Sequence, residues 1–241
     1  MKRAIGFKPG LVPTLAAALG VLATALLGNW QLNRAAEKLQ LQQRIEQAGR
    51  QPAVRLGAER IDPTGVHYAP VEASGEFKSD GTIYVDNRVR EGVAGYEIVT
   101  PLRLDGSARY VLVDRGWVRS GVDRTQLPEV ATPAERVAVE GIAVPGEPRV
   151  FELSSEVQAG RVWQNITVER YRKAFGLDLQ PIVIHQRNDL GDGLAHAWIR
   201  PDLGIDRHRA YALQWFCMSF AIVVLYVILN VKPASNAPRA A

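Results

Sequence analysis

One short stretch near the end of the sequence places a histidine at the head of a row of aromatic side chains. His208 has an arginine on either side and is followed by residues that suit a helix. If a helix begins near Asp206, residues three, seven and eleven positions after the histidine share its face. This face would consist of His208, Tyr211, Trp215 and Ser219. A neutral imidazole there could bind a metal through one ring nitrogen.

The two arginines beside the histidine indicate what kind of metal group would fit. Cations in the first turn of a helix oppose its macrodipole, so Arg207 and Arg209 are poorly placed unless an anion lies close. Their charge also favours the neutral imidazole, although Asp206 opposes this effect and could instead cap the helix. A haem would suit both features, because its iron takes an axial histidine and its propionates accept hydrogen bonds from arginine.

An interfacial belt is the alternative interpretation of the same stretch. Tyrosine and tryptophan favour the headgroup level of a bilayer, and Arg207 and Arg209 would then extend toward lipid phosphates. A phospholipid would supply the anion but would give His208 no role as a ligand. Both interpretations stay open from these residues alone.

Two uncharged apolar runs frame the chain, at residues 11–28 and 211–231. About 20 apolar residues cross a bilayer as a helix, so both runs are expected to do so. Pro13 is tolerable because it falls in the opening turn. After the first run, residues 29–49 are rich in helix-forming residues and stop at Gly49, so we expect the helix to continue as an exposed extension, with or without a kink.

A cleaved secretory signal is the alternative for the first run. Lys2, Arg3 and Lys8 form a basic leader, and residues 23–25 resemble a small-residue cleavage site. The apolar run continues past that site to Gly28, as an anchor should. Two spans therefore remain the prediction.

Two spanning helices place both termini on one side of the membrane and the middle of the chain on the other. Basic residues lie at both ends of both runs. Counted simply, the rule that cytoplasmic loops are basic would put the middle inside, but that rule applies to short loops. Charge alone leaves the orientation open.

The middle of the chain is predicted to be mainly β. Six segments are rich in Val, Ile, Tyr and Thr and are bounded by turn residues. They cover residues 71–77, 82–89, 95–104, 108–118, 135–144 and 181–188. An Asp-Gly turn predicts an antiparallel hairpin over 95–118, and residues 168–176 predict one short helix. The fold class is thus an α+β membrane protein, with two transmembrane helices flanking a mainly antiparallel sheet or barrel of six or seven strands.

The middle offers little chemistry of its own. Residues 92–95, GVAG, lack the lysine and hydroxyl of a phosphate-binding loop and read as a turn. His67, His185 and His196 are too scattered to predict a metal site, and the single cysteine, Cys217, excludes an internal disulfide or a cysteine cluster. The net charge of +4, with cations near the membrane boundaries, suits lipid rather than nucleic acid. We therefore expect that the protein is not an enzyme.

Two arginines in the strand segments are expected to be structural. Arg88 and Arg115, with Trp117 nearby, should stack or pair with carboxylates such as Asp86 or Asp114 rather than bind a ligand.

Four motifs of the chain, in this order, resemble the Surfeit locus protein 1 family of cytochrome c oxidase assembly factors. They are GNWQLNR (28–34), DNRVREGVAGYEIVTPL (86–102), VLVDRGWV (111–118) and HRAYALQWF (208–216). The resemblance covers nearly the whole chain, including the two anchors. It implies a non-enzymatic role in maturing the catalytic subunit of the oxidase, with haem a carried transiently as cargo. The implied partners are that subunit, haem a synthase and membrane lipids, without nucleic acid.

The resemblance also implies particular residues. The histidine of the family pattern H-x-x-Y-A-x-x-W, here His208, would be the axial ligand of the haem iron. Asp206 and Arg209 stand where family members commonly have asparagine and an apolar residue. The residues expected to contact haem are His208, Tyr211 and Trp215, which match the family pattern, together with Arg207, Arg209 and Trp30, which are chosen from their own chemistry and position.

The resemblance further implies an orientation in the inner membrane, with the middle domain in the periplasm. The expected parts are a cytoplasmic N-terminus (1–10), a transmembrane helix (11–28), a periplasmic domain with a helical extension (29–209), a second transmembrane helix (210–231) and a cytoplasmic tail (232–241). The alternative function is a cofactor-free scaffold that holds an assembly intermediate through the β domain, with the GWV motif and the turn at Gly92 as contact surfaces.

Overall fold

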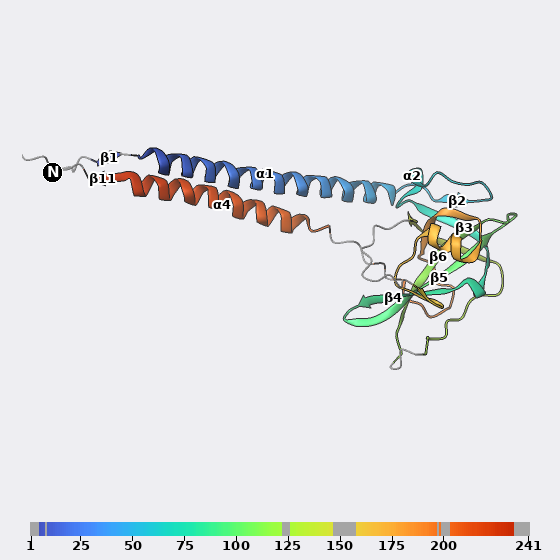
Figure 1. Ribbon diagram of the computed structural model, residues 1–241. Coiled ribbons are helices and arrows are strands. Elements are labelled where there is room, and N and C mark those ends of the chain that lie inside the picture. The colour runs from blue at the N-terminus through green and yellow to red at the C-terminus, as the bar shows by residue number, and fades with distance from the viewer. Residues whose placement is uncertain are drawn as a thin grey trace, which may run out of the picture. The chain divides into compact units, whose positions relative to one another are not determined.

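The computed structural model describes residues 5–7, 9–121, 126–146, 158–196, 198 and 203–233 (Figure 1). Its contacts divide the chain into two compact units. One unit is Met1–Gln43 with Pro201–Ala241, and the other is Arg44–Arg200.

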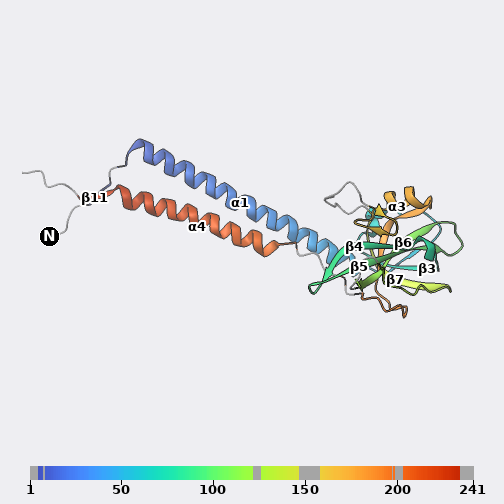
Figure 2. The same ribbon diagram turned by 60° about the horizontal axis from the view of Figure 1, so that its bottom comes forward.

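The first unit is a pair of long helices that lie side by side (Figure 1; Figure 2). The helix α1 spans Leu11–Ala48 and α4 spans Ile205–Asn230. Both are long and apolar enough to cross a membrane, which supports a membrane protein with two spans. The polar segment after Gly28 belongs to the same continuous helix as the first apolar run. Beyond the helices, β1 (Ile5–Phe7) pairs with β11 (Val231–Pro233) in a short antiparallel ribbon that the sequence did not predict.

The facing sides of α1 and α4 form a seam, defined here by partly or fully buried positions that recur every three or four residues. This spacing is typical of two helices packed along a common line. On α1 the seam contains Thr14, Ala17, Val21, Thr24, Gly28, Gln31 and Ala35. On α4 it contains His208, Ala212, Trp215, Ser219, Ile222 and Tyr226.

Hydrogen bonds join the two sides of the seam. The hydroxyl of Thr14 lies 2.7 Å from that of Tyr226, and the hydroxyl of Thr24 lies 2.6 Å from that of Ser219. One turn beyond Thr24, Gly28 leaves room for the ring of Phe216 on α4, since a Cβ at Gly28 would come within 2.8 Å of that ring. Polar contacts and small residues of this kind hold helices together in lipid, where the hydrophobic effect does not drive helices to associate.

The second unit is built on a sheet that, within the described residues, has nine strands in the order β2-β3-β7-β10-β6-β5-β4-β9-β8. An additional pairing of β3 with β5 closes the strands β3, β7, β10, β6 and β5 into a barrel. The bounds are β2 Val54–Leu56, β3 Pro70–Phe77, β4 Ile83–Arg90, β5 Val93–Leu104, β6 Tyr110–Arg119, β7 Val137–Pro145, β8 Gln158–Ala159, β9 Val162–Trp163 and β10 Leu179–Gln186. Most pairs are antiparallel, while β6 with β10, β2 with β3 and β4 with β9 are parallel.

Every strand of the barrel contributes to a buried interior by the alternation of its side chains. The buried residues from these strands are Val71, Ala73, Leu102, Leu104, Val111, Val113, Val139, Ala143, Ile182 and Ile184. The helix α3 (Val168–Phe175) covers the outer side, where Tyr171 packs with Leu112 and Val183 (Figure 2). Two shorter helical turns, α2 (Pro63–Val66) and η1 (Ser79–Gly81), complete the unit.

The predicted elements of the middle domain are confirmed. All six strand segments coincide with long strands, and β5 and β6 form the expected hairpin through a turn in which Gly106 has φ 65°. The helix α3 is capped by Thr167 and ends at the left-handed Gly176. The sheet has more strands than the six or seven expected, because β2, β8 and β9 are only two or three residues long and show no readable alternation.

Closure of the barrel depends on Gly75. At this residue β3 passes from β7, where Gly75 pairs with Val137, to β5, where it pairs with Leu104. A Cβ at Gly75 would overlap the carbonyl oxygen of Arg103. A residue without a side chain is therefore needed where the two neighbouring strands meet.

We expect Gly75→Ala to lower the free energy of unfolding by about 2 kcal/mol or more, because the backbone of β5 must move to admit the methyl group. Denaturant titration of the purified protein in detergent, followed by tryptophan fluorescence, measures this loss. Gly57→Ala is the matched control, since no atom lies within 4 Å of a Cβ there. Equal stability of the two variants would contradict this account of closure.

Candidate functional site

His208 lies in the first turns of α4 and is held at two points. Its backbone N–H donates to the carbonyl of Gly204 at 3.2 Å, and its ring Nδ1 lies 2.7 Å from Oε1 of Gln31 on α1. An amide oxygen only accepts hydrogen bonds, so the imidazole donates from Nδ1. The other ring nitrogen, Nε2, then carries the lone pair that can bind a metal.

Gln31 is the contact of His208 that the sequence did not predict. It lies just past the first apolar run and on the seam, three residues after Gly28. The spacing of Thr24, Gly28 and Gln31 is the signal that could have identified it. The adjacent Trp30, which was predicted to contact the ligand, has a side chain that is 55% exposed and lies outside the seam.

Only one of the two aromatic residues of the predicted face lies on the seam. Trp215 lies on the seam with His208, whereas Tyr211 is 51% exposed and lies outside it. The buried neighbour one turn from the histidine is Ala212 instead. Residues three and four positions after His208 both lie near its face of the helix. Here α1 lies on the side of Ala212, the fourth residue, rather than on the side of Tyr211, the third.

The charged residues around His208 are exposed. The helix is capped by Gly204, whose φ is 65°, so Asp206 is not the cap and lies in the first turn. There its carboxylate favours the macrodipole and lies 3.6 Å from the guanidinium of Arg209. The guanidinium of Arg207 lies close to Gly204, since a Cβ built on Gly204 would be 3.0 Å from its Nη2 atom. Exposed ion pairs contribute at most about 1 kcal/mol, so Arg209 can exchange its partner for another anion.

This end of the helix pair can therefore offer one imidazole nitrogen with cations beside it. Among the described residues there is no group of three or more His, Cys, Asp or Glu side chains that could hold a bare metal ion. A single imidazole suits a metal that brings the rest of its ligands with it, as the iron of a haem does.

The β domain has a second group of polar residues, centred on the buried Asp114 of β6. Its carboxylate lies 4.0 Å from Nε2 of His185 on the adjacent β10, and the His185 ring stacks on Trp198 at 4.2 Å. Burial raises the pKa of the Asp114 carboxyl well above its usual range, and the charge of Glu97 adds to this. Burial also lowers the pKa of His185 to about 4, assisted by the nearby Arg90 and Arg88.

The arginines of this domain are structural, as expected, but their carboxylate partners differ from those suggested. Arg88 pairs with Glu97 at 2.8 Å across the β4–β5 hairpin. Arg115 pairs with Asp192 at 2.7 Å, with both side chains fully buried. Neither Asp86 nor Asp114 is the partner, because both true partners come from other parts of the chain. Trp117 donates to the carbonyl of Arg88 at 2.7 Å.

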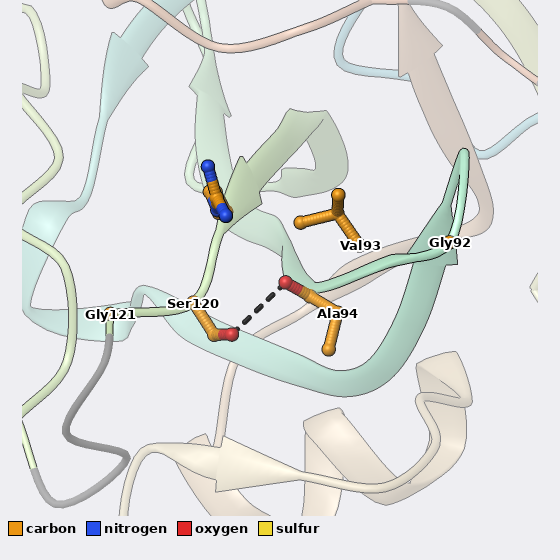
Figure 3. A pocket seen from close by; sticks show the side chains of 6 residues that line it. Gly92, Val93, Ala94, Ser120 and Gly121 are labelled. Atoms are coloured by element: carbon orange, nitrogen blue, oxygen red, sulfur yellow. Dashed lines mark hydrogen bonds between the residues drawn. The ribbon is translucent and has the colours of Figure 1, made fainter.

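An open hollow of about 340 Å³ lies beside the turn that joins β4 and β5 (Figure 3). Within it the hydroxyl of Ser120 donates to the carbonyl of Ala94 at 3.0 Å, so this hydroxyl is already engaged. Arg119 supplies the one cation of the lining. The segment 92–95 is thus a turn and the start of a strand, as predicted, and forms a shallow surface.

We expect Asp114→Asn to become progressively more stable than the unsubstituted protein as pH rises above about 4. The folded-state pKa of Asp114 lies above the unfolded value near 3.8, so its contribution to stability is complete below that value and is lost as pH rises through the folded pKa. Asparagine has no such loss. Thermal unfolding of both proteins between pH 4 and 8 measures the difference, with the exposed Glu59→Gln as control. A difference that is independent of pH would contradict the shifted pKa.

Comparison with known proteins places this geometry in context. The SURF1 family profile matches residues 18–220. A SURF1-like protein of Rickettsia conorii is 30% identical over 213 residues, covering 84% of each chain. One from Rickettsia bellii is 28% identical over 222 residues, covering 88% of each chain. An uncharacterized SURF1-like protein of Mycobacterium bovis is 27% identical over 209 residues, covering 84% of this chain and 75% of its own.

The family match runs from within α1, through the β domain, into α4, and so includes Gln31 and His208. The resemblance of the four sequence motifs is thereby confirmed. The chain belongs to the SURF1 family, a family of cytochrome c oxidase assembly factors.

Proposed function

We propose that this protein is a membrane-anchored haem chaperone that binds haem a and aids its insertion into the catalytic subunit of cytochrome c oxidase. His208 would be the axial ligand of the iron through Nε2. The observation that carries the proposal is the hydrogen bond from His208 Nδ1 to Gln31 Oε1 at 2.7 Å, which in the neutral imidazole assigns the free lone pair to Nε2. A bound haem a would supply the remaining ligands of its iron from its own ring.

The surroundings of His208 fit the two other parts of a haem. Propionates accept charge-assisted hydrogen bonds from guanidinium groups, and both Arg207 and Arg209 lie within one turn of the ligand. Aromatic side chains contribute apolar contact with a macrocycle, and Trp30, Tyr211 and Trp215 are the three that the proposal assigns to this role. Apolar contact would supply much of the affinity, while the single ligand would fix the orientation.

The proposal includes an orientation. With two spans, both termini lie on one side of the inner membrane, and we assign that side to the cytoplasm. The β domain, residues 44–200, would then be periplasmic and would meet the catalytic subunit, while haem a synthase would supply the cargo. His208 stands where the apolar part of α4 begins, so cargo would be held at the outer edge of the bilayer.

We expect His208→Ala to lose most of the haem that the unsubstituted protein carries. Both proteins are produced in cells that make haem a and purified in detergent, and the visible spectrum gives the haem per chain. His67→Ala, which changes a histidine of the β domain, is the matched control and should keep its haem. If His208→Ala and the unsubstituted protein carry equal haem, the assignment of this site is wrong.

A cofactor-free scaffold is the second candidate, and one surface feature favours it. The β4–β5 hairpin exposes Val89, at 52%, close in sequence to the hollow at Gly92. Trp117 is unsuited to test this surface, since it holds the hairpin through Arg88. Normal oxidase assembly with His208→Ala, together with failed assembly with Val89→Asp at equal protein abundance, would favour the scaffold.

A further inference from the structure

We infer that Gln31 is a positioning residue for the haem ligand: it holds the His208 imidazole in one tautomer and one orientation, and so sets the strength of the bond to iron. This inference rests on the proposed function. It concerns a residue outside the histidine motif, on the other helix and 177 positions away in the chain.

The geometry restricts the imidazole strongly. The backbone of His208 is fixed in the first turn of α4 by its bond to Gly204. The ring is then fixed from the opposite helix, because Gln31 Oε1 lies 2.7 Å from Nδ1. The backbone bond fixes where the side chain begins, and the contact with Gln31 restrains rotation of the ring about its side-chain bonds, so Nε2 is held in one direction.

The place of this contact within the seam also matters. Thr14 with Tyr226 and Thr24 with Ser219 are hydroxyl pairs, in which either atom can donate. The Gln31 contact has a fixed direction instead, because its oxygen can only accept. It also lies just beyond the apolar run of α1, where the ring can meet both the bilayer and the aqueous side.

The chemical consequence follows from the behaviour of histidine ligands. A metal-bound histidine generally donates its other N–H to an oxygen, which fixes the tautomer, orients the ring and makes the bound nitrogen more basic. Removing such an acceptor typically weakens metal binding by about 10- to 100-fold. A neutral amide does this more gently than a carboxylate would, which suits a cargo that must later be released.

Three substitutions separate positioning from a merely structural role. Gln31→Leu removes the acceptor at similar size, Gln31→Glu keeps an acceptor and adds charge, and Gln31→Asn keeps the amide but shortens its reach. Gln40→Leu makes the same change at an exposed position of the same helix and serves as the control.

Each full-length protein is purified in detergent and titrated with ferric haem a, and the reduction potential of the bound haem is measured. We expect Gln31→Leu to bind at least about 10-fold more weakly, with Gln31→Asn between it and the unsubstituted protein. Gln31→Glu should retain binding but with a more negative potential, because a more basic imidazole stabilises ferric iron. Gln40→Leu should match the unsubstituted protein in both measurements.

The outcomes distinguish this inference from the function on which it rests. If His208→Ala binds haem as well as the unsubstituted protein, the proposed function itself fails. If His208→Ala loses haem while Gln31→Leu and Gln31→Glu keep both the original affinity and the original potential, the role of Gln31 is wrong and the ligand assignment stands. Should Gln31→Leu not be recovered as a folded protein, the potential of Gln31→Glu decides, and an unchanged potential overturns the inference.

Discussion

In a bilayer the hydrophobic effect does not drive apolar helices together. The pairing of α1 with α4 must therefore come from other interactions. Lipid tails are as apolar as leucine, so helix association must come from close packing and from polar groups that would otherwise be unsatisfied. The seam supplies both, with small residues such as Gly28 and hydroxyl pairs such as Thr24 with Ser219. At its polar end the same device brings Gln31 to His208. The contact proposed to orient the ligand is thus one member of the series that pairs the helices.

The β domain satisfies a different constraint, because it buries a charged pair beside β6. Arg115 is fully buried and pairs with Asp192 through Nη2, which also donates to the carbonyl of Ala131, while Nη1 donates to the hydroxyl of Thr132. A buried pair adds little net stability, but removal of one partner leaves an uncompensated charge and typically costs about 3 to 5 kcal/mol. The pair therefore adds little to the free energy of folding. It fixes the segments around Ala131 and Asp192 against β6 because other arrangements would leave a buried charge unpaired.

Local pattern was sufficient to predict the elements but not the contacts between distant ones. Composition rich in Val, Ile, Tyr and Thr, together with the turn residues between segments, identified the six long strands, and apolar length identified the two candidate membrane helices, because each signal lies within one segment. Closure of the barrel requires β3 and β5 to meet at Gly75, which no single segment reveals. The partner of Arg115 lies 77 positions away, and nothing near either residue marks the pair.

The site shows the same division between local and distant information. His208 could be selected from the residues around it and from the family resemblance. The contact of Gln31 with His208 becomes visible only when α1 is packed against α4. The choice between Trp30 and Gln31 is a difference of about 100° around one helix. Periodicity within α1 alone suggests which positions form a seam, but not which residue of another helix each position will meet.

If His208 holds haem as proposed, the hydrogen bond between Gln31 and His208 would couple haem binding to the pairing of α1 with α4. Thermodynamic coupling between two events is reciprocal, so a haem that prefers the fixed imidazole must also favour the paired helices, by the same factor. Conversely, any partner that draws α1 and α4 apart at this end would release the imidazole and loosen its cargo. A chaperone built in this way could sense its acceptor through the spacing of two helices, with no movement inside the β barrel.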